Sequence, residues 1–444
     1  MSERKKRIMI DGRNLGLEKG TGVATYARNL SFCLRDLGYD VDVLYGGQAP
    51  RGISPLMREI SFFDSNVGDM SRWVRWLLQL RREFRNANGY QASRVPLTDI
   101  VIKDAFRSRL PHYDRIYNSP DLFAHAHGLY RNLPFLSGRH TVRFRNPPDL
   151  AHWTYPLPLR VPRVPNLYTL HDLVPLRLPY TTLDNKRRYL RLVSTIARRA
   201  DHVVTVSEAS KADIVRILKI PAERITNTYQ AVSIPDKYAN KPEDVVAREV
   251  EGTFGLGYKN YFLFWGSIEP KKNIGRIIEG YLSSNVRTPL VLVGAQAWKS
   301  EEELKLLYDD NIRTLVQSGE EIRVRKRVIQ LSYVPFPLLV SLIRGAKATV
   351  FPSLYEGFGL PVLESMLLGT PVISSNTASI PEVAGKAALL VDPYDSRAIG
   401  DAIRAFDFDS DLREDYVTRG RAQAALFSED AYKLRLKELY ARFL

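Results

Sequence analysis

The sequence predicts an α/β protein made of two doubly wound domains that face each other across a cleft. In both halves, short apolar runs rich in β-branched residues alternate with segments of helical periodicity, as in parallel sheets covered by helices. A polar, charged and proline-containing stretch at residues 235–257 separates the two series and is predicted to be a linker. The chain has 444 residues, which is enough for two or three domains.

The strand–helix–strand unit at residues 348–375 is the clearest of the series. Residues 348–351 form a short apolar run, and Pro361 stands where the first helical residue is expected, because its fixed φ suits a helix start. Gly357 and Gly359 lie between strand and helix and let backbone amides approach a ligand closely. Helix N-termini attract anions, and open α/β sheets bind ligands at the carboxyl ends of their strands. This loop is therefore a predicted phosphate-facing site.

Two carboxylates accompany this phosphate-facing loop. Glu356 lies in the loop itself, and Glu364 lies eight residues on, in the first turns of the helix. Carboxylates accept hydrogen bonds and therefore suit the hydroxyl groups of a sugar. A ligand that carries both hydroxyls and phosphates, such as a sugar nucleotide, reconciles the two features.

The segment E-G-F-G-L-P-V-L-E places seven residues between the two glutamates, among them Gly357, Phe358, Gly359 and Leu360. This phrase resembles the E-x7-E motif of retaining glycosyltransferase family four, whose members have the GT-B fold. Residues 379–385 and 390–393 also resemble that family, and the resemblance covers nearly all of the chain outside about residues 50–110. It implies a metal-independent hexosyltransferase with no cofactor beyond its sugar-nucleotide donor.

Composition limits the partners and the compartment. The formal net charge of +15 implies an anionic partner, and because no nucleic-acid-binding motif accompanies it, a phosphorylated ligand or anionic lipid is favoured. The single cysteine, Cys33, indicates a reducing compartment. Residues 1–7 lead directly into a strand without a signal peptide, and no apolar run reaches the roughly 20 residues that span a bilayer. We expect a cytoplasmic protein.

The first strand–helix–strand unit contains two motifs that need interpretation. A strand at residues 7–11 precedes a helix from about Gly22 to Leu37. The glycines before this helix do not complete a dinucleotide fingerprint, because the loop is too long and the third glycine is missing. Asp40 and Asp42 have the spacing of a metal-binding Asp-x-Asp, but a solvated strand start is the favoured interpretation. The family resemblance implies that the loop at Gly22 faces the donor diphosphate and the acceptor.

Residues 71–85 form a predicted amphipathic helix with an aromatic and aliphatic stripe flanked by arginines. Two interpretations fit this pattern. The helix packs on the core with its basic face exposed to solvent, or it lies on an anionic membrane surface.

Further candidate residues follow predicted strands of the first half. His171 ends a strand at residues 166–172, where the family has a sugar-contacting histidine. Ser207 is predicted to cap the next helix or to contact substrate. Trp153 and Tyr155, in a proline-rich stretch predicted as loop, present aromatic faces that can stack on a sugar.

Lys271 and Lys272 precede a predicted helix in the second half. A lysine at a helix N-terminus is unfavourable unless an anion binds there, so both are predicted diphosphate ligands. Lys272 matches the phosphate lysine of the family, whereas Ser267 stands where many members have arginine.

The resemblance assigns residues 1–236 to an acceptor-binding domain and residues 258–426 to a nucleotide-sugar domain, with a C-terminal helix at about 427–444 packing back on the first. His171, Glu356 and Lys272 are the expected catalytic residues. Donor binding is assigned to the remaining candidates, which are Gly22, Ser207, Lys271, Gly357, Phe358, Gly359, Leu360, Glu364 and Glu382, the last as base or ribose support.

The sequences of residues 171–175 and 266–273 most resemble those of bacterial mannosyltransferases of polysaccharide and lipopolysaccharide assembly. It implies transfer of mannose from GDP-mannose to a lipid-linked or oligosaccharide acceptor at the inner face of the cytoplasmic membrane. Glucose, rhamnose and fucose donors remain open. A nucleotide-sugar epimerase of the same fold and a non-catalytic nucleotide-sugar-binding protein are the alternatives.

Overall fold

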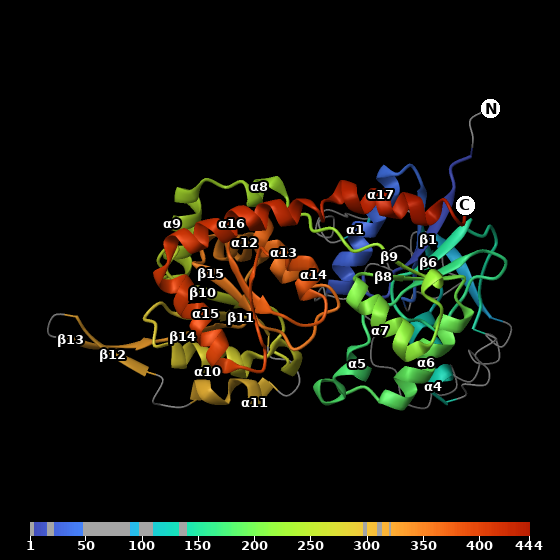
Figure 1. Ribbon diagram of the computed structural model, residues 1–444. Helices are drawn as coiled ribbons and strands as arrows, with labels where there is room; N and C mark the ends of the chain where they lie inside the picture. Colours follow the sequence, from blue (N-terminus) through green and yellow to red (C-terminus); the bar gives the residue numbers. More distant parts are fainter. Residues whose placement is uncertain are drawn as a thin grey trace, which may run out of the picture.

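The computed structural model describes residues 4–15, 22–47, 89–96, 110–132, 140–295, 300–308, 313–318 and 321–444. Figure 1 shows two lobes, one formed by the blue and green first half of the chain and one formed by the yellow and orange second half. The predicted helix at residues 71–85 lies outside the described residues.

The first domain is built on a sheet of nine strands in the order β5-β3-β4-β2-β1-β6-β7-β8-β9. All neighbouring pairs are parallel except β3–β4. The strands are β1 (Arg7–Asp11), β2 (Asp40–Tyr45), β3 (Tyr90–Val95), β4 (Arg115–Asn118), β5 (Val142–Phe144), β6 (Leu150–Trp153), β7 (Asn166–Thr169), β8 (His202–Thr205) and β9 (Ile225–Asn227).

Helices cover both faces of this sheet. One apolar cluster contains side chains of α1, and the other contains side chains of α4 and α6. The helices are α1 (Gly22–Asp36), α4 (Leu122–Asn132), α5 (Val174–Arg177), α6 (Lys186–Arg199) and α7 (Glu208–Leu218). Because β1, β6, β7 and β8 are parallel, the carboxyl ends of β1, β7 and β8 lie at the same edge of the sheet. This edge faces the second domain (Figure 1).

The second domain has a parallel sheet of six strands in the order β14-β11-β10-β15-β16-β17. Its strands are β10 (Phe262–Trp265), β11 (Leu290–Val293), β14 (Val328–Leu331), β15 (Ala348–Phe351), β16 (Val372–Ser375) and β17 (Leu389–Val391). Its helices are α10 (Ile274–Ser284), α11 (Ser300–Leu304), α12 (Phe336–Gly345), α13 (Leu360–Leu367), α14 (Ile380–Ala384), α15 (Ser396–Phe408) and α16 (Ser410–Ala425). A separate antiparallel hairpin joins β12 (Arg313–Ser318) and β13 (Glu321–Lys326).

Two stretches differ from the sequence-based expectation. The predicted linker contains α8 (Asp236–Ala239) and α9 (Glu243–Phe254), and α9 buries Val246 and Val250 against the second domain. The proline-rich stretch predicted as loop contains strand β6, which pairs with both β1 and β7. Prolines flank β6 rather than interrupt it, so they do not remove its backbone donors.

Helix α17 (Glu429–Tyr440) returns from the second domain to the first, above α1 in Figure 1. Tyr440 Oη lies 2.6 Å from His152 Nδ1 in the first sheet, and Lys433 Nζ pairs with Asp36 of α1 at 3.0 Å. Within the described part of the chain, no helix is both long and apolar enough to cross a bilayer.

Candidate active site

The loop between β15 and α13 carries the E-x7-E residues and requires its glycines. Gly359 is the N-cap residue of α13 and has φ +115°, a conformation that favours glycine. A Cβ there would also lie 2.7 Å from Ile380 Cδ1. The Phe358 side chain is buried against Tyr229 and Phe427, so only its backbone is available to a ligand. Pro361 follows Leu360 within the first turn.

The first domain lies directly against this loop. A Cβ at Gly357 would come within 3.0 Å of the Asp172 side chain and the His171 carbonyl oxygen. A Cβ at Gly22 would lie 3.5 Å from Leu360 Cδ1, so the start of α1 faces the start of α13. The structure therefore brings Gly22, His171 and the glutamate loop together between the two domains.

Lys272 and Glu356 form an ion pair in this cleft. Lys272 Nζ donates to Glu356 Oε1 at 2.6 Å, and each side chain is 13% exposed. Burial alone raises the pKa of Glu356, but the nearby Lys272 and Lys271 outweigh it and lower that pKa below the ordinary value. Glu356 is thus a carboxylate at neutral pH, as a hydroxyl acceptor must be.

Lys271 sits beside this pair. Burial disfavours its charged form, yet the carboxylates of Glu356, Glu269 and Asp172 together raise the pKa of Lys271. The two lysines precede α10 on a 3-10 turn at residues 270–272, with Lys271 Nζ 3.5 Å from Glu269 Oε1. Two ammonium groups in a narrow, partly dehydrated site suit a diphosphate.

Glu364, the second glutamate of the motif, lies within α13. Its burial raises the pKa of Glu364 to about 7, and a hydrogen bond with the Trp265 side chain opposes the shift only in part. It therefore differs from Glu356, because it lacks a lysine partner that holds it ionised. A pair of ligand hydroxyls would add polar partners to the one that Trp265 supplies.

His171 is held by the first domain in one tautomer. Its Nε2 lies 3.0 Å from the Thr154 carbonyl oxygen, which can only accept, so Nε2 carries the proton. The Tyr26 ring meets the imidazole edge to face at 4.7 Å. Burial lowers the pKa of His171, although Thr154 and Asp172 oppose the shift, and the ring is neutral at pH 7.

Asp11 fixes the residue that holds His171, and the sequence did not indicate this role. Asp11 is fully buried and accepts from Thr154 N at 2.5 Å and from Thr154 Oγ1 at 2.9 Å. Desolvation raises the pKa of Asp11 to about 6, which the Thr154 hydrogen bonds limit. Its position at the end of β1, at the same sheet edge as His171, was the available signal.

The N-terminus of α7 touches the glutamate loop. Ser207 Oγ accepts from Ser210 N at 3.0 Å as the helix cap and donates to Gly357 O at 2.7 Å. Ser210 Oγ donates to the same carbonyl oxygen at 3.2 Å. The predicted capping role of Ser207 is thus confirmed, and its hydroxyl also contacts the glutamate loop, whereas a contact with substrate stays a prediction.

Glu382 does not join the cluster around Lys272. Its carboxylate accepts from Glu208 N at 2.9 and 3.1 Å, at the start of α7. Burial raises the pKa of Glu382 to about 7, and the neighbouring Glu208 carboxylate adds to the shift. Glu382 therefore makes a contact between the two domains. Its predicted contact with the donor stays a prediction.

Two other candidates have different surroundings from those expected. Trp153 is fully buried, stacks on Tyr168 and donates to Asn166, so its face is closed to a sugar. Asp42 is buried rather than solvated and pairs with Arg7 at 2.5 Å and with Arg115 at 3.3 Å. Among the described residues, no three or more His, Cys, Asp or Glu side chains gather as a metal site would require.

Two models of known protein families match most of the chain. Residues 254–423 match the model described as glycosyl transferases group 1, and residues 21–228 match that of a glycosyl transferase 4-like domain. The boundary between the two matches falls near the junction of the two sheets.

Among curated proteins, O-antigen chain mannosyltransferase B from Escherichia coli is 36% identical over 278 residues, covering 61% of this chain and 68% of that one. O-antigen chain mannosyltransferase RfbU from Salmonella typhimurium is 30% identical over 53% of this chain and 59% of its own length. Among solved structures, sucrose-phosphate synthase from Thermosynechococcus elongatus superposes with a TM-score of 0.63 at 19% identity, covering 99% of both chains. HepE from Anabaena, in complex with UDP and glucose, superposes with a TM-score of 0.62 at 14% identity, covering 98% of this chain and 100% of that one.

Two facing Rossmann-like domains with a glycine- and glutamate-bearing loop at the cleft define a GT-B glycosyltransferase. This chain belongs to the group 1 glycosyltransferases.

Proposed function

We propose that the protein is a retaining mannosyltransferase that moves mannose from GDP-mannose onto a lipid-linked or oligosaccharide acceptor in O-antigen or related polysaccharide assembly. The single observation that carries the assignment of roles is the Lys272–Glu356 ion pair, in a loop whose next residue, Gly357, lies against the backbone of His171. The mannosyl donor is inferred from the E. coli and S. typhimurium relatives, which are named as mannosyltransferases.

The chemistry would proceed by departure of the nucleoside diphosphate and attack of the acceptor from the same face of the sugar. Charge then develops on the leaving phosphate, and Lys272 and Lys271 are the groups that would stabilise it. Glu356 would hold hydroxyls of the donor sugar, and Glu364 would hold the ribose. The neutral His171 would contact the sugar near the reacting carbon, with its orientation fixed by Thr154.

The reaction would need no metal, because two lysines are available to the diphosphate. Transfer is expected to survive EDTA. Complete loss of transfer on chelation, restored by Mg²⁺, would contradict this part of the proposal.

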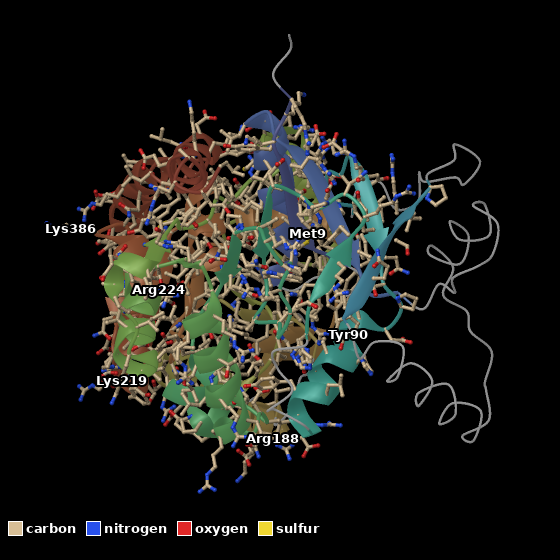
Figure 2. The ribbon with its side chains drawn as sticks, turned by 90° about the vertical axis from the view of Figure 1, so that its right-hand side faces the viewer. Met9, Tyr90, Arg188, Lys219, Arg224 and Lys386 are labelled. Atoms are coloured by element: carbon tan, nitrogen blue, oxygen red, sulfur yellow. The ribbon has the colours of Figure 1, made fainter. Side chains whose placement is uncertain are left out.

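A lipid-linked acceptor requires the protein to work at a membrane, and α6 supports this. Its sequence KRRYLRLVSTIARR has six basic residues and no acidic one. Arg187, Arg188 and Arg191 are exposed, and Leu190 beside them is 40% exposed. Figure 2 shows Arg188 at the outer edge of the molecule. A basic surface with interspersed apolar side chains fits an anionic lipid surface. We place the protein peripherally at the inner face of the cytoplasmic membrane.

A thermal-shift panel of nucleotide sugars tests the donor, because a ligand of the native state raises the melting temperature. GDP-mannose is expected to stabilise the protein more than UDP-glucose, GDP-fucose or dTDP-rhamnose at equal concentration. Incubation of GDP-mannose with acceptor, followed by NMR of the anomeric proton, is expected to give the α-linked product. Stronger stabilisation by a UDP-sugar, or an inverted product, would overturn the corresponding assignment.

A further inference from the structure

A second cavity lies in the first domain on the α4 and α6 side of the sheet. It has a volume of about 280 Å³, near the lower end for small-molecule sites. Tyr130 of α4 and Thr195 of α6 both line it, and a hydrogen bond of 3.0 Å joins their hydroxyl oxygens. Figure 1 shows these two helices together below the first sheet. We call this cavity the α6 pocket.

The body of the α6 pocket is apolar. Its lining includes the buried Leu157 and Leu159, together with Leu192 and Ile196 of α6. Tyr168 also lines it, and its hydroxyl donates to the carbonyl oxygen of Leu159, another lining residue. Such walls favour an aliphatic chain, since burial of methylene groups away from water is favourable.

Two arginines stand at the edge of the same pocket. Arg160 and Arg199 both line it and are exposed, and neither has a carboxylate within ion-pair distance in the part of the chain that the structure describes. The charges of both arginines act electrostatically on Tyr168, which also lines the pocket. Two unpaired guanidinium groups beside an apolar cavity are complementary to an anion attached to an apolar body.

His140 supplies the observation that points independently to a ligand. The residue is only 3% exposed, and neither ring nitrogen has a hydrogen bond of good geometry. Burial lowers the pKa of His140 to about 4, a shift that the Pro158 carbonyl opposes and the Arg199 charge reinforces. Buried polar groups without partners are rare in native proteins. A ligand head group in the pocket would give this ring a better-placed partner than the Pro158 carbonyl.

The α6 pocket is separate from the catalytic cleft. Arg199 ends α6 immediately before β8, so it lies toward the amino ends of the strands, whereas His171 and Ser207 follow their carboxyl ends. The lining residues also belong to the sheet face opposite α1. The pocket therefore cannot hold the donor sugar or its diphosphate.

We propose that the α6 pocket binds a single-chain amphiphile, with the aliphatic chain among Leu157, Leu192 and Ile196 and an anionic head group between Arg160, Arg199 and His140. Phosphate and carboxylate heads share this chemistry, since either can accept two hydrogen bonds from an arginine. The proposal rests on this cavity alone and does not depend on glycosyl transfer.

Isothermal titration of the full chain with decyl phosphate and with decanoate, below their critical micelle concentrations, tests the proposal and separates the two heads. Saturable one-to-one binding of either compound is expected, with decanol and inorganic phosphate each at least about tenfold weaker. Inorganic phosphate binding as tightly as decyl phosphate would overturn the role of the chain. Equal binding of decanol would overturn the role of the anion.

Variants locate the binding. Arg199→Gln is expected to weaken the preferred compound about tenfold or more, whereas Arg198→Gln, the same charge change on the next residue and outside the pocket, is expected to leave it unchanged. His140→Phe keeps an aromatic ring and is expected to weaken binding while preserving the melting temperature. Leu192→Trp is expected to fill the pocket and abolish binding. Equal affinity of all four variants would show adsorption elsewhere and overturn the proposal.

Discussion

Lys272 Nζ lies 2.6 Å from Glu356 Oε1, joining the residue that we assign to the diphosphate to the one that we assign to the sugar. Both side chains are largely buried, so each neutralises the other's charge in a site of low dielectric. A bound donor would replace both halves of this pair, with phosphate oxygens for Lys272 and hydroxyl groups for Glu356. The ion pair thus holds both side chains in position for the donor.

Removing the lysine tests the diphosphate assignment. Lys272→Ala is expected to weaken binding of both GDP-mannose and free GDP, because a charge-assisted contact of this kind contributes roughly 1.5–3 kcal/mol. Lys386→Ala, an exposed lysine at the outer edge of the second domain (Figure 2), serves as the control and is expected to bind normally. Calorimetric titration with GDP is the measurement, and unchanged affinity in Lys272→Ala would contradict the assignment.

Glu382 distinguishes a domain contact from a donor contact. Because its carboxylate binds the first amide of α7, Glu382→Ala is expected to loosen the first domain from the Gly357 loop. Transfer should then slow severalfold while GDP affinity stays within about twofold, since we assign the nucleotide to the second domain. The exposed Glu414→Ala is the matched control. Loss of GDP affinity in Glu382→Ala would restore its assignment to the nucleotide.

The raised pKa of Glu364 predicts a pH effect on stability. The pKa of Glu364 is about 7 in the native state and 4.5 for an ordinary glutamate, so the native state prefers the neutral acid. The stabilisation is full below about pH 4.5 and is lost as pH rises through 7. Glu364→Gln should therefore match wild type at pH 5 and be more stable at pH 8, by about 1–3 kcal/mol in the free energy of unfolding.

Urea titrations at the two pH values measure this difference. Glu279→Gln, the same change at an exposed glutamate of α10, is the matched control. A Glu364→Gln protein that gains no stability at pH 8 would show that the carboxyl group is ionised without cost in the native state.

The basic face of α6 predicts salt-sensitive membrane binding. The full chain should sediment with vesicles containing phosphatidylglycerol, and binding should weaken as salt rises. Arg187→Gln with Arg191→Gln should reduce it severalfold, whereas Lys219→Gln with Lys386→Gln changes the net charge equally and should have little effect. Equal loss in both pairs would mean that net charge, rather than α6, drives adsorption.

Local sequence predicted the parts of the site that are local in the chain. The glutamate loop was recognised because strand, glycines, proline and helix lie within about 20 residues, and each follows from backbone preference. Asp11 was missed because its partner Thr154 is 143 positions away. The contact of Glu382 with the first domain could not be predicted, because its partner Glu208 is 174 positions away.

Burial was the second quantity that the sequence did not supply. Trp153 appeared available to a sugar because prolines surround it, yet pairing of β6 between β1 and β7 places the ring inside the core. Asp42 appeared solvated at a strand start, yet the strand is internal and Arg7 from β1 neutralises the carboxylate. In each case a neighbouring strand, not the local sequence, decides the environment.

The division of labour between Glu356 and Glu364 is tested most directly by titrating both glutamine variants with GDP and measuring kcat for each. Glu356→Gln is expected to lower kcat strongly and to keep or improve GDP affinity, because it removes the carboxylate that occupies Lys272. Glu364→Gln is expected to weaken GDP binding and to spare kcat. Loss of GDP affinity in Glu356→Gln, with normal affinity in Glu364→Gln, would contradict the placement of sugar and ribose along this loop and helix.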